Sequence, residues 1–484
     1  MSEPTSVLSR PLLPASIAVF TTVALAAFEG IAVAAAIPQV AADLGQIALL
    51  PWVITAYLLA AGVATVAAGP LIDALGVRSM FRIAVIVFIV GAVSSAFAPS
   101  MSLMIATRLL HGIGGGLVIA VGLAGVILIY PEKLVGRAFA ANATVWGVMG
   151  VAGPAIAAFM LTALSWRWIF LVNLPLGLIA LAAGWRVMPG PLPGATRRRL
   201  DGFGVGLVLA FNLALLLTVD RLGPMSALWG ALAGISAIVY WRHARRNSEP
   251  VMRLRHLAER PFGSLGVSIA LLLTGAMAAN VFVPLYVQGG RGGSTSLAAF
   301  SVLFFVIGWT LGSILSSRLL DRQAETTVMR LGFGITIPAL GVLAAASMVD
   351  APIGIPFALL LAAGTGVGAA TNAGLSLLRS VTPTAEIGRA TAAHQFYRNI
   401  GFTLGAAIGG AVLLAVVAAS VGDVSAVQEL LAGGGGRADL ATADAISRGF
   451  TASVITGAVV SLLAVAPFVS LRRHLAAARA AAGH

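Results

Sequence analysis

Fourteen long hydrophobic segments run through this chain of 484 residues, and they leave few folds open to it. Most reach the ~20 residues that an α-helix needs to cross the hydrocarbon of a bilayer. Apolar residues are continuous within the segments, whereas the strands of a membrane β-barrel would alternate apolar and polar residues. The chain is therefore predicted to be an all-α polytopic membrane protein with 14 transmembrane helices.

Composition agrees with a membrane protein. Hydrophobic residues make up 59% of the chain and charged residues only 10%, whereas a soluble protein carries about 25% charged residues. There is no cysteine, which excludes a disulfide framework and a thiolate metal site. The first segment is too long for the apolar part of a signal peptide, so we treat it as a span. The predicted spans are residues 14–38, 47–68, 79–98, 102–130, 136–160, 166–187, 202–219, 226–241, 263–288, 297–317, 327–348, 352–378, 388–418 and 449–470.

Basic residues are distributed unevenly between the two sides of the predicted membrane. With the N-terminus in the cytoplasm, 23 of the 30 Lys and Arg residues fall on the inner side and five on the outer side. This asymmetry, with Ala- and Gly-rich composition and a single lysine, predicts a multi-pass protein of the bacterial cytoplasmic (inner) membrane with both termini cytoplasmic. The net charge of +13 is expected to face anionic lipid, and no nucleic-acid partner is expected.

Two predicted cytoplasmic stretches divide the chain. Residues 188–200 are rich in Pro and Gly and end in arginines, and residues 242–262 are basic. They bracket the seventh and eighth spans, so three parts are predicted. These are an N-terminal six-helix bundle over 1–190, a linker with two inserted helices over 191–260, and a C-terminal six-helix bundle over 261–484.

Several short motifs accompany the spans. After the second span comes Gly69-Pro-Leu-Ile-Asp73-Ala-Leu-Gly76-Val-Arg78, where a tight turn needs glycine at positive φ. A weaker echo, Asp321-Arg322, follows the tenth span, and repeated halves are typical of transporters. The other motifs are Arg108-Leu-Leu-His111-Gly112-Ile-Gly114, Gly150-Val-Ala-Gly153-Pro154, Trp52-Val-Ile-Thr-Ala-Tyr57, Trp166-Arg-Trp-Ile-Phe-Leu-Val-Asn173-Leu-Pro175-Leu-Gly177, and Glu29 followed by Pro38.

Together and in this order, the motifs resemble those of the major facilitator superfamily over nearly the whole chain. The last three are similar to the fourteen-helix drug:proton antiporter branch, where Asp usually stands in place of Glu29. The resemblance implies two six-helix halves, an inserted pair packed outside them, and a central cavity that opens alternately to each side. It also implies proton-coupled export of a lipophilic, drug-like compound.

The chain departs from the family pattern at three places. Ala74 stands where a basic residue normally follows the loop acid, which leaves open how tightly the cytoplasmic gate is latched. Ala157-Ala158 replaces a Gly pair in the fifth span, which weakens the inference of outward transport. His111 replaces a Gln in the fourth span.

Glu29 is the one acidic residue deep inside a predicted span. A carboxylate in hydrocarbon is costly and marks a functional site by default. It lies about 22 Å from the inner end of its span and about 14 Å from the outer end, and Arg108 lies about 9 Å from the outer end of its own span. The resemblance implies that the first and fourth spans both line the central cavity, so residues at similar depths there are a candidate buried pair. Two interpretations stay open: a structural salt bridge, or a carboxylate that alternates between a proton and a cationic substrate or Arg108.

Three further residues lie at depth on the same helices or in the second half. His111 is one turn from Arg108, either as a packing residue or as a residue that modulates protonation of Glu29. His394 and Arg398 share one face of the thirteenth span, with Arg398 about 16 Å from its inner end. Both a structural role and a gate or substrate contact stay open for them.

Gating is predicted at two motifs. Asp73 and Arg78 are interpreted as a gate element, with Asp73 docking near the N-terminus of the thirteenth span, around Gly388, in the outward-open state. The alternative is a solvated loop acid. The residues that can bend the fifth span, or pack it closely, are Gly150, Gly153 and Pro154.

The remaining polar residues of the spans are weaker candidates. The cavity candidates beside Glu29, Arg108 and Arg398 are Tyr57, Asn280 and Asn372. Asp201, Asp220 and Glu249 lie at the ends of the inserted spans and are interpreted as interfacial, without function.

The function predicted from these residues is secondary active transport: proton-coupled antiport that exports a lipophilic compound, with one proton per cycle through Glu29. Export or flipping of an endogenous lipid or metabolite is the alternative, and anion uptake or a receptor role is less favoured. Enzyme motifs such as His-Glu-x-x-His, Gly-x-Ser-x-Gly and a Walker loop are absent from the sequence. No cofactor or metal is expected, and the expected partners are the substrate, protons and membrane lipids of a monomer.

Overall fold

The computed structural model describes residues 6–46, 49–190, 201–220, 224–421 and 440–482. Every regular element over these ranges is a helix, which confirms the all-helical prediction. Residues 191–200 and 221–223 of the predicted linker lie outside the described ranges. The chain divides into two compact units, which are described separately below.

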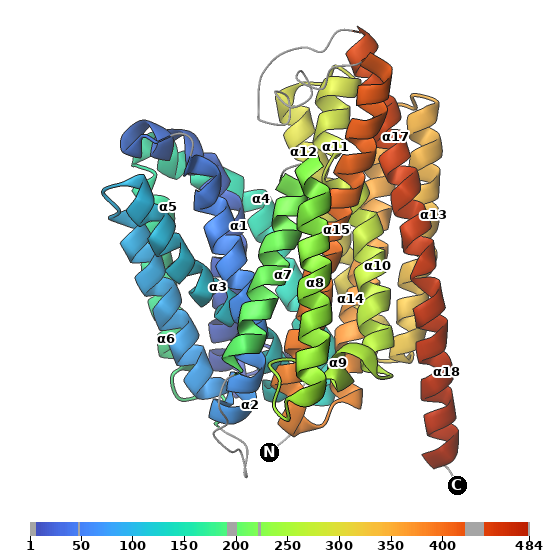
Figure 1. Ribbon diagram of the computed structural model, residues 1–484. Coiled ribbons are helices and arrows are strands. Elements are labelled where there is room, and N and C mark those ends of the chain that lie inside the picture. Colours follow the sequence, from blue (N-terminus) through green and yellow to red (C-terminus); the bar gives the residue numbers. More distant parts are fainter. Residues whose placement is uncertain (1–5, 47–48, 191–200, 221–223, 422–439, 483–484) are drawn as a thin grey trace. The chain divides into compact units, whose positions relative to one another are not determined.

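Unit 1 comprises Met1–Ala214, Gly230–Phe262 and Leu378–Phe396. It therefore joins the first helices to a segment that follows almost two hundred residues later in the chain. Its helices are α1 (Leu13–Leu44), α2 (Leu50–Ala96), α3 (Met101–Ile129), α4 (Glu132–Ala163), α5 (Arg167–Leu171), α6 (Asn173–Gly184), α9 (Leu254–Ala258), η3 (Thr384–Glu386), and most of α7 (Gly202–Asp220) and α8 (Pro224–Arg246) (Figure 1). The first residues of α15 (Ile387–Val421) also belong to it.

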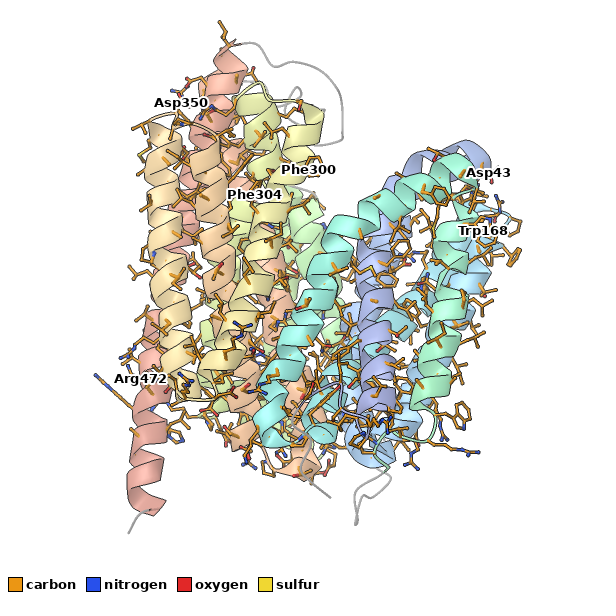
Figure 2. All side chains as sticks on the ribbon, turned by 180° about the vertical axis from the view of Figure 1, so that it is seen from behind. Asp43, Trp168, Phe300, Phe304, Asp350 and Arg472 are labelled. Atoms are coloured by element: carbon orange, nitrogen blue, oxygen red, sulfur yellow. The ribbon has the colours of Figure 1, made fainter. Side chains whose placement is uncertain are left out.

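Unit 2 comprises Leu215–Trp229, Gly263–Leu377 and Tyr397–His484. Its helices are α10 (Phe262–Asn280), α11 (Val283–Leu285), the π-helical η2 (Tyr286–Gly290), α12 (Thr295–Leu319), α13 (Glu325–Met348), α14 (Gly354–Val381), the rest of α15, α17 (Leu440–Leu463) and α18 (Val465–Ala482). Figure 2 shows Asp350 and Arg472 at opposite ends of this unit.

α2 joins two predicted spans in one element of 47 residues. A straight helix of that length would measure about 70 Å, more than twice the ~30 Å of a bilayer core. The backbone leaves helical geometry at Gly76, with φ +78° and ψ +158°. Only glycine adopts this conformation without steric cost, so the predicted glycine turn is confirmed at Gly76. Asp73 is nevertheless helical, whereas the sequence predicted a loop there.

Helix length and hydropathy identify nine helices of the described chain as able to cross a membrane, or ten if the two parts of α4 count as one. α2 counts once among them, and α1 and α7 contribute shorter apolar stretches, Leu13–Glu29 and Gly202–Thr218. The helices thus agree with a polytopic membrane protein, and the number fourteen stays a prediction.

α4 bends where the sequence places Gly150, Gly153 and Pro154. Its two parts, Glu132–Gly150 and Ala155–Ala163, meet at 43°. Proline removes a backbone donor and clashes with the preceding turn, so a kink at this motif has an identifiable cause. The bend agrees with the predicted effect of the motif on helix geometry, and its part in gating stays a prediction.

Candidate functional site

Glu29 and Arg108 form an ion pair inside unit 1. Arg108 Nη1 donates to Glu29 Oε1, and the two side chains are 2% exposed or less. Arg108 also donates through Nε to the carbonyl of Val53, at 2.9 Å. Three helices therefore meet at one guanidinium: α1 supplies the acid, α3 the arginine and α2 the carbonyl. The contact predicted from matching depths is present.

Two aromatic rings face the same guanidinium. Its Cζ lies 4.4 Å from the centre of the Tyr57 ring and 5.6 Å from that of Phe170. Both distances are within the ~6 Å over which a ring face attracts a cation. Arg108 therefore has favourable partners besides the carboxylate, which matters if the carboxylate ever becomes neutral.

His111 completes the cluster. Its Nδ1 lies 2.9 Å from Arg108 Nη1. Because a guanidinium can only donate, Nδ1 must be the acceptor, and the proton of the imidazole is then on Nε2. The geometry therefore assigns a neutral His111 in one tautomer. Its ring lies against Phe88, with the centres 4.4 Å apart.

Two buried polar atoms of the cluster have no hydrogen-bond partner among the described residues: Glu29 Oε2 and His111 Nε2. A buried polar atom without a hydrogen-bond partner costs about 1–3 kcal/mol, so such atoms are rare in protein interiors. Where one occurs, a functional role is one explanation. The cluster therefore holds an unused carboxylate oxygen and an unused imidazole donor at the same depth.

Close packing of α2 against α3 explains why this geometry is fixed. A Cβ on Gly112 would lie 2.3 Å from the Tyr57 carbonyl oxygen, and a Cβ on Gly115 would lie 2.3 Å from the Tyr57 hydroxyl. A Cβ on Gly116 would lie 2.1 Å from the Ala61 carbonyl oxygen. Glycines following Arg108 in the sequence thus let the two backbones touch, which holds the Tyr57 ring over the guanidinium.

Asp73, which the sequence predicted as part of a gate, contacts the start of α15 near Gly388, where it was predicted to dock. Its Oδ1 accepts the backbone N–H of Gly388 at 2.7 Å, and its Oδ2 accepts that of Arg389 at 3.2 Å. These are unsatisfied donors of the first turn of α15, at the positive end of the helix dipole. A Cβ on Gly388 would lie 2.5 Å from Asp73 Oδ1, so the contact requires glycine there.

Arg78, the other residue of the predicted gate element, contacts the chain that follows α6. Its Nε donates to the carbonyl of Met188 at 2.7 Å, and its backbone N–H donates to the carbonyl of Pro189 at 2.9 Å. Arg78 therefore fastens the chain after α6 to the turn at the end of α2's first half. The part of Arg78 in a gate element stays a prediction.

Arg398, Asn280 and Asn372 belong to unit 2. The Arg398 guanidinium lies 5.9 Å from the Trp309 ring. Asn372 donates to the Ser313 carbonyl at 3.1 Å and to the Ser316 hydroxyl at 2.7 Å, which fastens α14 to α12. Asn280 is buried at the end of α10. His394, also buried, belongs to unit 1.

Sequence reasoning missed two groups around Arg108. Phe170 lies in the Trp166–Gly177 motif, but nothing in a single sequence tells which ring of an aromatic-rich motif faces a distant cation. The Val53 carbonyl carries no sequence signal at all, because every residue has one. Among the described residues, no three His, Asp or Glu side chains gather as a metal site would require.

Comparison with known proteins gives a consistent result. The sequence profile of the Major Facilitator Superfamily matches residues 19–406. The multidrug transporter protein MdtP of Bacillus subtilis (strain 168) is 26% identical over 401 residues, which cover 80% of this chain and 72% of MdtP. The putative multidrug resistance protein MdtD of Pectobacterium carotovorum subsp. carotovorum (strain PC1) is 34% identical over 283 residues, 56% of this chain and 60% of MdtD.

Solved structures resemble the fold at low identity. A bacterial homologue of the iron transporter ferroportin, in an outward-facing state, has a TM-score of 0.62 at 11% identity, covering 95% of this chain and 99% of that one. The human organic anion transporter MFSD10 has a TM-score of 0.62 at 14% identity, covering 95% and 98%. At these identities the likeness concerns the fold alone.

Proposed function

Because the chain belongs to the major facilitator superfamily, and so is a membrane transporter, we propose that it is a proton-coupled antiporter that exports a lipophilic, drug-like compound. In this proposal it has fourteen transmembrane helices, acts as a monomer in the bacterial cytoplasmic membrane, and has both termini in the cytoplasm. The observation that carries the coupling is the buried Glu29–Arg108 pair with an unused carboxylate oxygen.

The proposed cycle uses Glu29 as the proton carrier. A proton from outside neutralises its carboxyl group as the substrate leaves, and the proton is later released to the cytoplasm. The freed carboxylate then favours the next cationic substrate. A proton and a cation thus compete for one anionic site, and this competition is what couples their opposite movements.

The surroundings of Arg108 support both protonation states of the acid. Leaving a buried charge without a partner is costly. When Glu29 is neutral, Arg108 still has the Val53 carbonyl, His111 Nδ1 and two ring faces around it. The cluster can therefore keep the guanidinium in place while the carboxyl group changes charge, which a simple structural salt bridge has no need to do.

The relatives support the class of substrate. MdtP is named a multidrug transporter and MdtD a putative multidrug resistance protein, and the match to MdtP covers most of both chains. Aromatic rings beside an acid suit a flat or lipophilic cation, because ring faces and a carboxylate both attract positive charge.

Transport in vesicles tests the proposal. Ethidium, a lipophilic monovalent cation, is added outside inside-out vesicles with an acidic interior, and its uptake is compared for the wild type, Glu29→Gln and Glu259→Gln. Removing the proton carrier should lower gradient-driven transport at least about 100-fold, the usual effect of losing a positioned proton-transfer group. Glu259→Gln removes an exposed acid outside the cluster and should match the wild type. Undiminished transport by Glu29→Gln would refute the proposal.

A further inference from the structure

A second charged cluster lies in unit 1, around Arg389 in the first turn of α15. Its side chain is 6% exposed, and its Nη2 donates to Glu249 Oε2 at 3.1 Å. Its Nη1 lies 3.8 Å from Asp73 Oδ2, too far for a good hydrogen bond but close enough for attraction. Arg389 is thus held between the gate acid of α2 and an acid of the segment between α8 and α9.

That segment, Asn247–Arg253, continues the network. Arg253 lies 3.4 Å from Glu249 and 2.9 Å from Glu386 of η3. Acids and arginines therefore alternate from Asp73 to Glu386, across segments more than three hundred residues apart in sequence. We call Asn247–Arg253 the connector.

Two further side chains, of which Arg255 is charged, complete the far end of the network. His256 Nε2 lies 3.0 Å from Glu386 Oε2, and Arg255 Nη1 lies 3.5 Å from the same oxygen. Glu386 therefore receives charge from the connector and from α9 at once, directly before α15 begins. Glu386, just before the first turn of α15, and Arg389, within that turn, are thus both held in ion pairs.

The network is partly shielded from water. The side chain of Asp73 is 8% exposed, that of Glu386 17% and that of Glu249 31%. Ion pairs on an open surface contribute little, because water and salt screen them, whereas partly buried pairs are screened much less. The pair between Arg389 and Glu249 therefore has the burial and the geometry needed to influence where α15 begins.

The connector is itself fixed to the inserted helices. The Tyr240 hydroxyl of α8 accepts the N–H of Met252 and donates to its carbonyl, both at 2.8 Å. Asp201, at the start of α7, accepts the N–H of Val251 at 3.2 Å and contacts His243 of α8 at 2.9 Å. Glu249 is thus carried by a segment that both inserted helices hold in place.

Apolar packing supports the same attachment. Val251 and Met252 are buried in a cluster with residues of α2, α7, α8 and α15. The cluster comprises Val66, Val208, Tyr240, Ala244, Val251 and Met252, with Phe396 packed against it. Residues of the inserted pair, the connector, α2 and α15 therefore pack together within unit 1.

We propose that Glu249 is a positioning residue of the gate at Asp73, and that the inserted pair α7–α8 anchors it through the connector. Glu249 takes the charge of the Arg389 side chain, which leaves both oxygens of Asp73 to the backbone donors of Gly388 and Arg389. The carboxylate thereby stabilises the docked position of α15's first turn. The inference rests on the proposed function only in taking the opening of this contact as a step of transport.

Labelling of a single cysteine tests the proposal directly, because the natural chain contains none. Ala390, in the first turn of α15, is 1% exposed, so Ala390→Cys reports when this turn leaves its packing. The rate of reaction with a water-soluble maleimide is measured on purified protein, without substrate or gradient. Glu249→Gln should raise the rate about three- to tenfold, as expected for losing one partly buried charged hydrogen bond.

Matched variants separate this role from general damage. Glu249→Asp keeps the charge and should restore slow labelling, and Glu259→Gln, an exposed acid beside the connector, should not change it. Gly388→Ala is the positive control, because its Cβ would meet Asp73 Oδ1 at 2.5 Å. Adding Glu249→Gln to Arg389→Gln should have little further effect, because both changes remove the same pair.

Each possible labelling result either supports or overturns the positioning role of Glu249. The proposal is supported if Glu249→Gln is labelled faster than the wild type and Glu249→Asp is labelled as slowly as the wild type. Glu249→Gln should also have little further effect on the rate in the Arg389→Gln background. Unchanged labelling, equal effects of Gln and Asp, or additive effects with Arg389→Gln would overturn the proposal. Because no substrate is used, the result stands apart from the Glu29 transport test, and either proposal can fail without the other.

Discussion

Arg108 is the central residue of the candidate site, and only some of its contacts can be predicted from the sequence. Its pairing with Glu29 was predicted from similar helix depth together with the resembled family, in which the first and fourth spans both line the central cavity. The ring of Phe170 and the carbonyl of Val53 could not be predicted, since they meet the guanidinium only through tertiary packing. A sequence can thus predict the charged pair of a site, but not the rings and carbonyls that surround the pair.

His111 gives the first residue-scale prediction. As the neutral acceptor beside Arg108, it should be replaceable by a side chain that also accepts. His111→Gln offers a carbonyl oxygen and should keep gradient-driven ethidium transport within about threefold of the wild type, whereas His111→Leu leaves a buried donor unpaired and should lower it about tenfold or more. Equal activity of the two variants, at equal expression, would contradict the assigned tautomer and role.

His256 gives a prediction for pH. Burial lowers its pKa below the usual value of 6.5, against the opposing pull of Glu386 and despite its hydrogen bond to that residue. The unfolded chain therefore binds a proton on this side chain at a pH where the folded chain does not. Its contribution to stability is present above about pH 6.5 and is lost as the pH falls through the depressed folded value.

Thermal unfolding in detergent measures this effect. Between pH 7.5 and pH 5, the wild type should lose more of its melting temperature than His256→Gln does, because glutamine takes up no proton. Parallel losses in the two proteins would show that His256 does not titrate as described.

Glu249 is a residue whose contacts the sequence did not predict. The sequence shows its charge and its place at the end of an inserted helix, and it was interpreted as interfacial, without function. Its partner Arg389 follows 140 residues later, and no pattern along the chain links the two. Asp73 lies in a motif that resembles a family signature, whereas no recognised motif contains Glu249, which is why the docking of Asp73 was predicted and its neighbour was not.

At the scale of the element, α2 and α3 show what the glycines contribute. The 108–114 motif was recognised as a pattern, and the structure supplies its reason: backbone contact with α2 at Tyr57 and Phe88. The turn at Gly76 was predicted for the right physical reason, positive φ. Continuity of α2 through Asp73 was not predicted, because a Gly- and Pro-containing stretch reads as a loop even where a helix passes through it.

Packing of α3 on α2 predicts a stability effect. A Cβ added at Gly116 would lie 2.1 Å from a backbone oxygen of Ala61, which cannot move aside without shifting the helix. Gly116→Ala should therefore destabilise the protein by about 1–3 kcal/mol, as overpacking does.

Gly341→Ala is the matched control, because Gly341 is also helical and has no atom near the added Cβ. Alanine there should be neutral or stabilising by up to ~1 kcal/mol, since alanine favours helix more than glycine. Melting temperatures in detergent compare the two. A similar loss in both variants would argue against backbone contact between α2 and α3.

At the scale of the whole molecule, the two compact units do not follow chain order, because Leu378–Phe396 belongs with the first helices. The boundaries predicted at residues 190 and 260 came from linker composition, which reports where the chain is polar and not which helices pack together. Membership of the superfamily, in contrast, was carried by short motifs spread along the chain, and the match over residues 19–406 confirms it.

The charge balance of transport is a prediction at this scale. A single deep acid in the proposed spans implies one proton for each monovalent cation, so the exchange moves no net charge. At zero pH gradient, an imposed membrane potential should not drive ethidium transport, although it supplies about 2.3 kcal/mol per elementary charge for each 100 mV. Strong potential-driven transport would require at least one further proton site.

The most direct test of the account is proton release on substrate binding. Purified protein in weakly buffered detergent solution is mixed with tetraphenylphosphonium, and a pH indicator records the released protons while binding is measured in parallel. The account predicts release of up to about one proton per bound cation from the wild type, and none from Glu29→Gln that still binds. Equal release from both proteins, or binding by the wild type without any release over the pH range of transport, would contradict the claim that Glu29 exchanges a proton for the substrate.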